Sequence, residues 1–228
     1  MKIISFLNSK GGVGKTTLAI NLARHLYLYN YSKIESYKPR VLLVDADPQG
    51  SVRDWQEAGN QTDIDVIAAD RKQTLMNLPN LLAKSDYDWV LIDTPGNAQE
   101  ITAAAISISD TCLIPVQPSP YDLWASEDIA ELIRIRQTLT NGKPEAFYVL
   151  NRCIPRTKIA KDVFDHLSTS AIRMLGEKIT NRVIYANSAK EGKTIFEFGD
   201  EGAWDDISTL GHALINTFTY VGVPDDVF

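Results

Sequence analysis

The sequence predicts an α/β protein built on a mostly parallel, twisted sheet that helices flank on both faces. Strand-like apolar runs alternate with helix-like stretches over the whole chain, which is the order of a sheet with helical crossovers. Several runs, such as VLLVD, WVLID and FYVLN, are almost continuously apolar. Strands that are buried on both faces have this composition, so we expect residues 1–228 to form one such domain.

The predicted elements follow one another with short connections. The expected strands are Lys2–Leu7, Val41–Asp45, Asp65–Ala68, Trp89–Asp93, Thr111–Val116, Ala146–Asn151 and Arg182–Tyr185. The expected helices, in which apolar residues recur at helical spacing, are Thr16–Tyr29, Gln73–Ala83, Ser126–Leu139, Ile159–Leu175 and Trp204–Phe218. The polar segment Asn30–Arg40 is expected to form a surface loop.

The composition is that of a globular protein, with 44% hydrophobic and 23% charged residues. No run of about 18 apolar residues occurs, so no transmembrane helix is expected. The apolar N-terminus leads directly into a glycine-rich turn, which favours a first strand over a signal peptide and predicts a cytoplasmic protein. Cys112 and Cys153 lack metal-site spacing and are expected to be buried thiols.

The charge is unevenly distributed along the chain. The formal net charge is -6, but the segment from Arg134 to Lys193 holds 12 Lys or Arg against 5 Asp or Glu. A basic zone within an acidic protein either binds DNA phosphates or is a set of solvated helix charges. Charge alone leaves both interpretations open.

A glycine-rich turn, Lys10–Thr17 (KGGVGKTT), follows the first strand and opens the first helix. Such a turn directs backbone N–H groups at phosphate oxygens, and the helix N-terminus favours negative charge. This context predicts a P-loop NTPase, with Lys15 at the β- and γ-phosphates and the Thr16 hydroxyl on Mg²⁺. The expected phosphate cradle consists of Gly11, Gly12, Val13, Gly14, Lys15, Thr16 and Thr17.

Phosphoryl transfer also requires a metal and a placed water molecule. The run WVLID ends in Asp93, and an acid after four apolar residues is typical of a Walker B strand, so Asp93 is expected to hold Mg²⁺ directly or through water. The run VLLVDADPQGS ends the second strand with Asp45 and Asp47. Asp47-Pro48 also predicts a turn with a helix cap, which does not exclude a catalytic role.

The string KGGVGKTT, with Ser9 where the common P-loop has glycine, resembles the deviant Walker A box of the ParA/MinD family of P-loop ATPases. The resemblance implies that ATP and Mg²⁺ are bound and that Asp47 positions or deprotonates the attacking water. It implies that Asp45 organises the water shell of the metal. It also implies that Lys10 reaches the nucleotide of a second subunit, in a homodimer with ATP sandwiched between the subunits. Asn151, with Arg152 beside it, is implied to bind the adenine edge.

Two further strings, residues 115–126 (PVQPSPYDLWAS) and 191–197 (EGKTIFE), resemble small plasmid-type ParA proteins. The resemblance implies plasmid or chromosome partition. ATP-driven dimerisation would create non-specific DNA binding on the nucleoid, and a ParB-like centromere-binding or cargo adaptor protein would stimulate hydrolysis and release the DNA. Because the first strand begins at residue 2, no N-terminal operator-binding domain is expected. The candidate phosphate contacts are Arg156, Lys158, Lys161, Arg173, Lys178, Arg182, Lys190 and Lys193.

Three alternatives remain. The same ATPase could position another cargo, such as a carboxysome or a chemoreceptor cluster, because nothing in the chain identifies the cargo. A MinD-like membrane ATPase needs a basic amphipathic helix, but Trp204–Phe228 contains four Asp and no Lys or Arg, so no membrane partner is expected. A small-molecule P-loop enzyme is the third alternative, for which no substrate signature is present. The two cysteines do not suit a nitrogenase-type iron protein.

Overall fold

The computed structural model of the chain describes residues 1–29, 37–60, 63–176 and 178–219. Most of the predicted loop Asn30–Arg40 and the end of the acidic segment Trp204–Phe228 lie outside the described residues. The strands in the described part are β1 (Lys2–Phe6), β2 (Val41–Asp45), β3 (Asp65–Ala68), β4 (Trp89–Asp93), β5 (Thr111–Val116), β6 (Glu145–Leu150) and β7 (Arg173–Met174).

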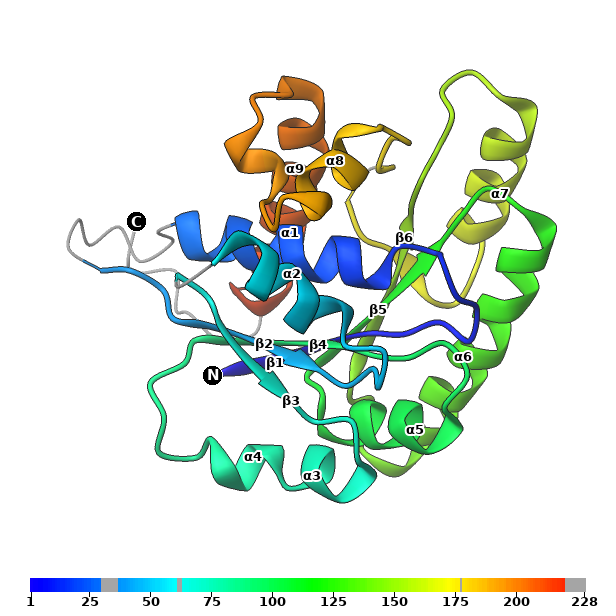
Figure 1. Ribbon diagram of the computed structural model, residues 1–228. Coiled ribbons are helices and arrows are strands. Elements are labelled where there is room, and N and C mark those ends of the chain that lie inside the picture. Colours follow the sequence, from blue (N-terminus) through cyan, green and yellow to red (C-terminus); the bar gives the residue numbers. More distant parts are fainter. Residues whose placement is uncertain (30–36, 61–62, 177, 220–228) are drawn as a thin grey trace, which may run out of the picture.

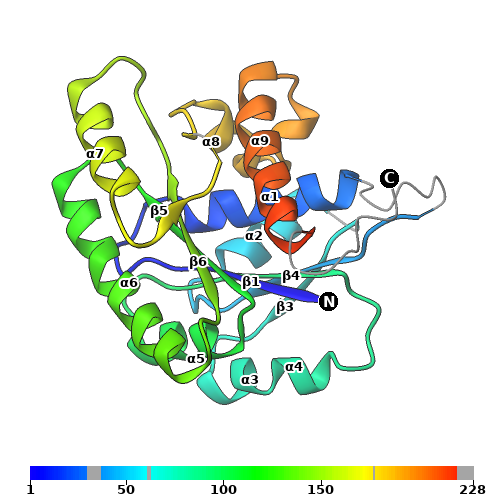
Figure 2. The same cartoon turned by 180° about the vertical axis from the view of Figure 1, so that it is seen from behind.

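These strands form one twisted sheet in the order β3-β2-β4-β1-β5-β6-β7, and every neighbouring pair is parallel. The sheet crosses the middle of the molecule, as Figures 1 and 2 show from opposite sides. The central strand β1 lies between β4 and β5. After β1 the chain continues toward the β3 edge of the sheet, to β2, and after β4 it continues toward the β7 edge, to β5. Ligands bind at such a reversal, beyond the carboxyl ends of the strands.

Helices cover both faces of the sheet, as predicted. They are α1 (Lys15–Leu28), α2 (Ser51–Gly59), α3 (Lys72–Met76), α4 (Leu78–Leu81), α5 (Gln99–Ile108), α6 (Pro120–Leu139), α7 (Lys158–Ser168), α8 (Ile184–Lys190) and α9 (Glu201–Thr219), with a short 3₁₀ helix η1 (Ile195–Glu197). In Figure 1, α1, α2, α8 and α9 lie above the sheet, and α3, α4 and α5 lie below it. The predicted fold class is confirmed.

The core has two layers because successive strand residues point to opposite faces. In β4, Val90 and Ile92 pack into the layer beneath α3 to α7, whereas Trp89 and Leu91 pack into the layer beneath α1, α2 and α9. Each such fully buried apolar side chain stabilises the fold by about 1.5–3 kcal/mol. The continuous apolar runs of the sequence therefore reflect burial on both faces.

The seventh strand was predicted in the wrong place. The edge of the sheet is Arg173–Met174, which pairs with β6, whereas the predicted strand Arg182–Tyr185 is a turn that enters α8. Ile172 and Leu175, at the two ends of β7, pack into opposite core layers, and this burial fixes the strand. The predicted helix over Ile159–Leu175 accordingly ends at Ser168, where serine and threonine side chains compete for backbone hydrogen bonds.

Other helix predictions were incomplete. Helices α2 and α5 were not predicted, since α2 buries only Val52 and Trp55 and α5 is rich in small residues. The predicted helix Gln73–Ala83 is two short helices, because Pro79 lacks the N–H that would continue the first one. Helix α6 starts at Pro120, a residue that suits a first helical turn, rather than at Ser126.

Two expectations from composition can be compared with the structure. Cys112 and Cys153 are both buried free thiols, as predicted. Across the described residues, no helix combines the length and the apolar character that are needed to cross a bilayer.

Candidate functional site

A cavity of about 460 Å³ opens at the carboxyl edge of the sheet, a size in the ordinary range for small-molecule sites. Among the predicted site residues, its lining includes Gly11, Gly12, Gly14, Lys15, Thr16, Thr17, Asp47, Asn151 and Arg152. Lys10, Val13, Asp45 and Asp93 do not line it. The cavity is also lined by Thr94, Gly96 and residues of the segment 179–189, which includes the predicted strand Arg182–Tyr185.

The P-loop backbone requires its glycines. Gly12 and Gly14 have φ values of 78° and 96°, in the left-handed region that favours glycine. A Cβ atom on Gly14 would lie 2.3 Å from the Asn151 amide nitrogen, so glycine is also needed sterically. Gly14 is the N-cap of α1, where no side chain caps the helix and no acid lies in the first turn. The free N–H groups of this terminus suit an anion.

Three side chains hold the P-loop carbonyls. Gln117 Nε2 and Arg152 Nη1 donate to Gly12 O at 2.7 and 3.0 Å, and Asn151 Nδ2 donates to Val13 O at 2.8 Å. The Asn151 Oδ1 atom accepts from Arg152 N at 2.9 Å, so both ends of this amide are engaged within the protein. Asn151 and Arg152 thus support the loop, and adenine binding by Asn151 stays a prediction. Gln117 was not predicted, although it lies in the proline-rich string after β5.

Lys15 is held in place before any ligand binds. Its Nζ donates to the carbonyls of Asn8 and Lys10, each at 3.1 Å, and the residue is buried. Burial lowers the pKa of Lys15, while Asp93 and Asp47 act to raise it. Lys15 therefore places a positive charge at the P-loop, where a phosphate would complete its hydrogen bonds.

Thr16 and Asp93 meet beneath the P-loop. The Thr16 hydroxyl donates to Asp93 Oδ2 at 2.6 Å, whereas the buried Oδ1 atom of Asp93 has no partner among the described residues. Burial raises the pKa of Asp93 to about 7, against which the Thr16 bond and Lys15 act. A buried carboxylate oxygen without a partner, beside a hydroxyl, fits a Mg²⁺ ion whose other ligands are water and phosphate. Thr16 and Asp93 would hold that ion.

Asp45 and Asp47 have separate environments. Asp45 pairs in register with Asp93 on the neighbouring strand and is fully buried. Its Oδ1 atom accepts from Asp47 N at 3.2 Å, and its Oδ2 atom accepts from the backbone N and the Nε of Arg53, both at 3.2 Å. Asp47 reaches the cavity, and its carboxylate accepts from Gln49 N at 2.9 Å. Sequence reasoning missed Arg53, because it lies two residues beyond the string VLLVDADPQGS, in a helix that was not predicted.

Lys10 does not line the cavity of its own chain and instead meets α6. Its Nζ lies 2.5 Å from Asp122 Oδ2 in α6, and its side chain is 42% exposed. Asp122, in contrast, is almost completely buried. Lys10 is therefore a surface lysine with a buried partner, and its predicted role toward a second subunit stays a prediction.

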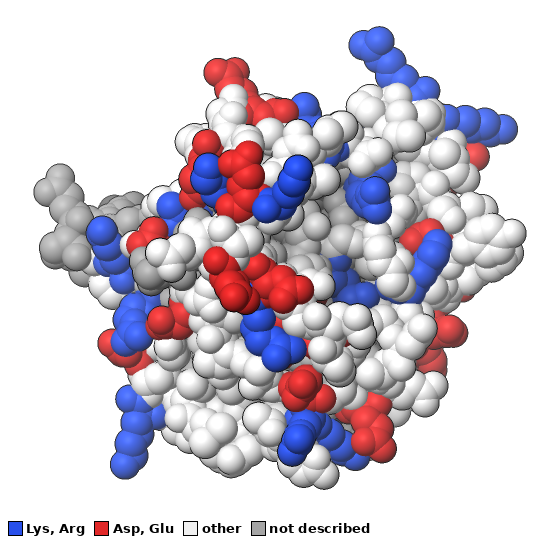
Figure 3. All heavy atoms as spheres, in the orientation of Figure 1, with Lys and Arg blue, Asp and Glu red and all other residues white. Residues whose placement is uncertain are grey.

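The basic zone is partly neutralised by acids. Arg182 lies 3.5 Å from both Asp200 and Asp206, and Lys193 lies 2.9 Å from Glu191. In the described part of the chain, no ion pair involves the other candidates Arg156, Lys158, Lys161, Arg173, Lys178 and Lys190. Figure 3 shows basic side chains projecting at the upper right, over the end of the molecule that carries α7. Contact of these candidates with DNA phosphates stays a prediction.

Residues 4–195 match the family described as the CobQ/CobB/MinD/ParA nucleotide binding domain. The chain belongs to this family. The match runs from β1 to η1 and contains every residue that lines the cavity. The resemblance to ParA and MinD proteins inferred from the P-loop string is thereby confirmed.

Proteins similar to this chain have names that refer to different processes. The chain is 33% identical to the maintenance of carboxysome distribution protein A of Halothiobacillus neapolitanus over 218 residues, which is 93% of this chain and 95% of that protein. It is 27% identical to the chromosome partitioning protein ParA of Caulobacter vibrioides over 236 residues, with coverages of 82% and 81%.

Solved structures show the same fold. The ATP complex of a substituted McdA from Cyanothece superposes with a TM-score of 0.75 at 18% identity, covering 94% of this chain and 96% of that one. MinD from Pyrococcus horikoshii, complexed with Mg-ADP, gives a TM-score of 0.68 at 19% identity, with coverages of 98% and 99%. These neighbours bind adenine nucleotides, in the second case with magnesium.

Proposed function

We propose that the chain is an ATPase that binds ATP and Mg²⁺ in this cavity and uses hydrolysis to position a large cargo over DNA. The Thr16–Asp93 pair carries the proposal, because a buried carboxylate oxygen without a partner lies directly beneath an intact P-loop. The ion would neutralise charge on the phosphate oxygens. Family membership and the nucleotide-bound neighbours support ATP as the ligand.

Different residues of the chain would bind the phosphates, orient the attacking water and sense the γ-phosphate. The P-loop N–H groups and Lys15 bind and orient the phosphates. Asp47, which reaches the cavity, orients the attacking water and accepts its proton. Thr94 and Gly96 follow the Asp93 strand and line the same cavity, where they would sense the γ-phosphate.

Dimerisation is the second part of the proposal. The ammonium group of Lys10 lies outside its own cavity at an exposed position, from which it would reach the nucleotide of a second copy. There it would neutralise charge that develops on the phosphates, as an arginine finger does. Two copies would then bring together the unpaired basic residues near α7 and α8 into one surface for DNA phosphates. The protein would associate with the nucleoid in this state.

Light scattering or sedimentation of the wild type and Asp47→Ala tests this scheme. With ATP and Mg²⁺, Asp47→Ala should remain a dimer that binds plain duplex DNA, because it binds ATP and hydrolyses it much more slowly than the wild type. With ADP, both proteins should be monomers that do not bind DNA. Equal DNA binding with ADP and ATP would contradict the scheme, and the absence of any ATP-dependent dimer would favour the small-molecule enzyme.

Two cargoes fit the proposal. Plasmid or chromosome partition is supported by the resemblance to ParA, whereas the relative that aligns over 93% of the chain distributes carboxysomes. A ParB-like centromere-binding protein or a cargo adaptor would stimulate hydrolysis in either case. Deleting the gene in its host separates the two: loss of a replicon over generations indicates partition, and clustering of a protein body with stable replicons indicates the second cargo.

A further inference from the structure

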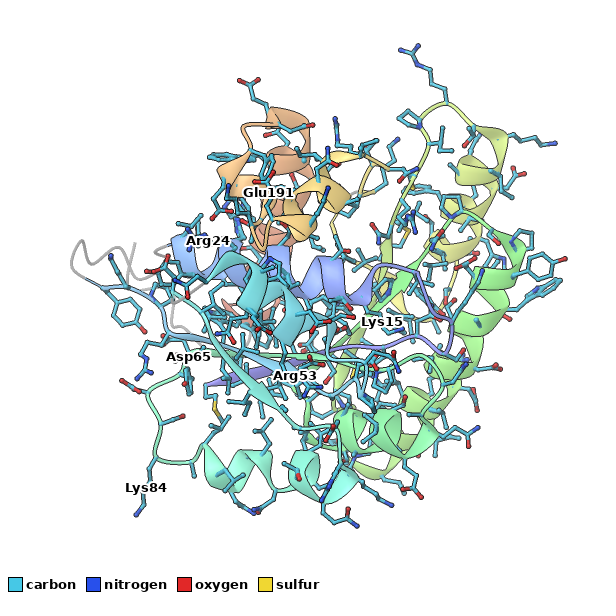
Figure 4. The ribbon with its side chains drawn as sticks, in the orientation of Figure 1. Lys15, Arg24, Arg53, Asp65, Lys84 and Glu191 are labelled. Carbon is cyan, nitrogen blue, oxygen red and sulfur yellow. The ribbon has the colours of Figure 1, made fainter. Side chains whose placement is uncertain are left out.

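Arg53 lies outside the cavity and contacts the loop between β2 and α2 at more than one point. It is the third residue of α2, and in Figure 4 it lies beneath that helix. Its Nε and its backbone N both donate to Asp45 Oδ2 at 3.2 Å, and its Nη2 lies 3.4 Å from the Asp47 carbonyl. A Cβ on Gly50 would lie 3.0 Å from the same Nη2 atom. One guanidinium group therefore bonds to the Asp45 carboxylate and lies within hydrogen-bond distance of the Asp47 carbonyl, in the space that a side chain on residue 50 would enter.

Asp45 needs this contact because its carboxylate is completely buried. A buried charge is tolerated only when it is paired and hydrogen-bonded. In the described part of the chain, the ion pair of Asp45 is with Arg53, whose side chain is 41% exposed. Asp45 also accepts an N–H in the first turn of α2, where Gly50 has no side chain with which to cap the helix.

The direction of Asp47 depends on the same loop. The Asp47 carboxylate accepts a hydrogen bond from Gln49 N, which belongs to that loop. Among the described residues, no strand donates a hydrogen bond to this carboxylate. The base of α2 is itself fixed, since Val52 and Trp55 are buried and Trp55 Nε1 donates to Lys193 O at 3.0 Å. Arg53 thus reaches back from an anchored helix to the loop. The loop is also tied to the sheet by Ala46 N, which donates to Asp93 O, but Asp47 and Gln49 have hydrogen bonds only within residues 45–53 in the described structure.

We propose that Arg53 is a positioning residue for Asp47: it clamps residues 45–50 and so fixes the Asp47 carboxylate toward the attacking water. This inference rests on the proposed ATPase function. Arg53 does not line the nucleotide cavity, so it acts through the loop and not by contact with ATP. The expected signature is a loss of hydrolysis with nucleotide binding retained.

The kinetic test uses Arg53→Gln and Arg53→Lys, with Arg134→Gln as the matched control. Arg134 is an arginine of α6 with a similarly exposed side chain, 47%, and it pairs with Glu131. Arg53→Gln should lower kcat by about 10–100-fold, as loss of a supporting contact at a catalytic site does, and change the Kd for ATP–Mg²⁺ by less than about threefold. Arg53→Lys should recover part of kcat, because lysine restores the charge without the planar fork. Arg134→Gln should resemble the wild type.

Two double-mutant cycles show what Arg53 acts through. In an Asp47→Ala background, Arg53→Gln should have no further effect on hydrolysis, because the carboxylate that it positions is absent. In nucleotide-free protein, Arg53→Gln should lower the Tm by about 2–4 °C, and this loss should disappear in an Asp45→Asn background. The second cycle needs neither ATP nor activity.

The outcomes separate the alternatives. Wild-type kcat in Arg53→Gln would overturn the inference, and so would additive effects with Asp47→Ala. A parallel loss of kcat and ATP affinity would show a merely structural role and would overturn it as well. A wild-type protein without ATPase activity would overturn the proposed function and the positioning role together, while the melting cycle would still measure the contact between Arg53 and Asp45.

Discussion

The ammonium group of Lys10 and the buried carboxylate of Asp122 form an ion pair at 2.5 Å between the P-loop and α6. The second carboxylate oxygen of Asp122 is buried without a partner among the described residues. Asp122 is buried and pairs with Lys10, so movement of Lys10 toward a second subunit would leave a buried carboxylate without its cation. The pair links the proposed dimerisation to a cost within the monomer.

Asp122→Asn should therefore make dimerisation easier. The amide keeps the shape of the side chain and removes the charge that retains Lys10, so the ATP concentration at half-maximal dimer should fall by about fivefold, or roughly 1 kcal/mol. Sedimentation over a series of ATP concentrations measures the concentration at which half of the protein is dimeric. Asp128→Asn, an exposed position on the same helix, is the control. A higher ATP requirement would mean that Asp122 aims Lys10 productively.

Gly14→Ala should weaken nucleotide binding, and Gly142→Ala is the matched control. Both glycines have strongly positive φ values, 96° and 87°, so both substitutions strain the backbone by about 1–3 kcal/mol. Only at Gly14 would the new Cβ clash, at 2.3 Å from Asn151, whereas nothing lies within 4 Å at Gly142. Titration with a fluorescent ATP analogue should show at least about tenfold weaker binding for Gly14→Ala alone. Equal affinities would contradict the steric argument.

Asp93→Asn should stabilise the nucleotide-free protein while it removes Mg²⁺-dependent ATP binding. The folded-state pKa of Asp93, about 7, lies above its usual 3.8, so the folded chain binds this proton more tightly and loses stability as the pH rises between these values. At pH 8 the variant should gain about 1 kcal/mol, which is about 2–4 °C in Tm, and at pH 4 nothing. Thermal melting at both pH values, with and without ATP–Mg²⁺, checks this. A lower Tm at pH 8 would contradict it.

His25 should make the protein sensitive to acid. Its ring is buried against Tyr29 and His212, with centroids 5.6 and 5.1 Å away, and burial lowers its pKa to about 4. Because the unfolded chain binds a proton at the usual 6.5, the free energy of unfolding falls as the pH drops from about 6.5 to 4, by up to about 1.4 kcal/mol per unit.

Urea unfolding of His25→Phe at several pH values measures this contribution. The variant should lose less stability than the wild type between pH 6.5 and 4. His166→Gln, on the exposed face of α7, should follow the wild type. Identical pH profiles for the wild type and His25→Phe would show that His25 does not sense acid.

Local features of the sequence predicted the P-loop and much of the sheet. The P-loop depends on glycines at consecutive positions and on its place between a strand and a helix, which are properties of neighbouring residues. Asp93 was found because it ends a strand that is buried on both faces. The edge strand Arg173–Met174 was missed because two residues between Ile172 and Leu175 carry too little periodicity to predict a strand.

The sequence by itself determined the fold class, the phosphate-binding turn and the acids that end β2 and β4, because each depends on a short run of residues. Only the tertiary structure decided which groups hold these parts in place. Lys10 meets Asp122 across 112 positions and Gln117 meets Gly12 across 105, through parallel crossovers that no local pattern encodes. It also showed that Asp45 is buried against Arg53 while Asp47 reaches the cavity, because the sheet and α2 enclose one carboxylate and leave the other at the edge.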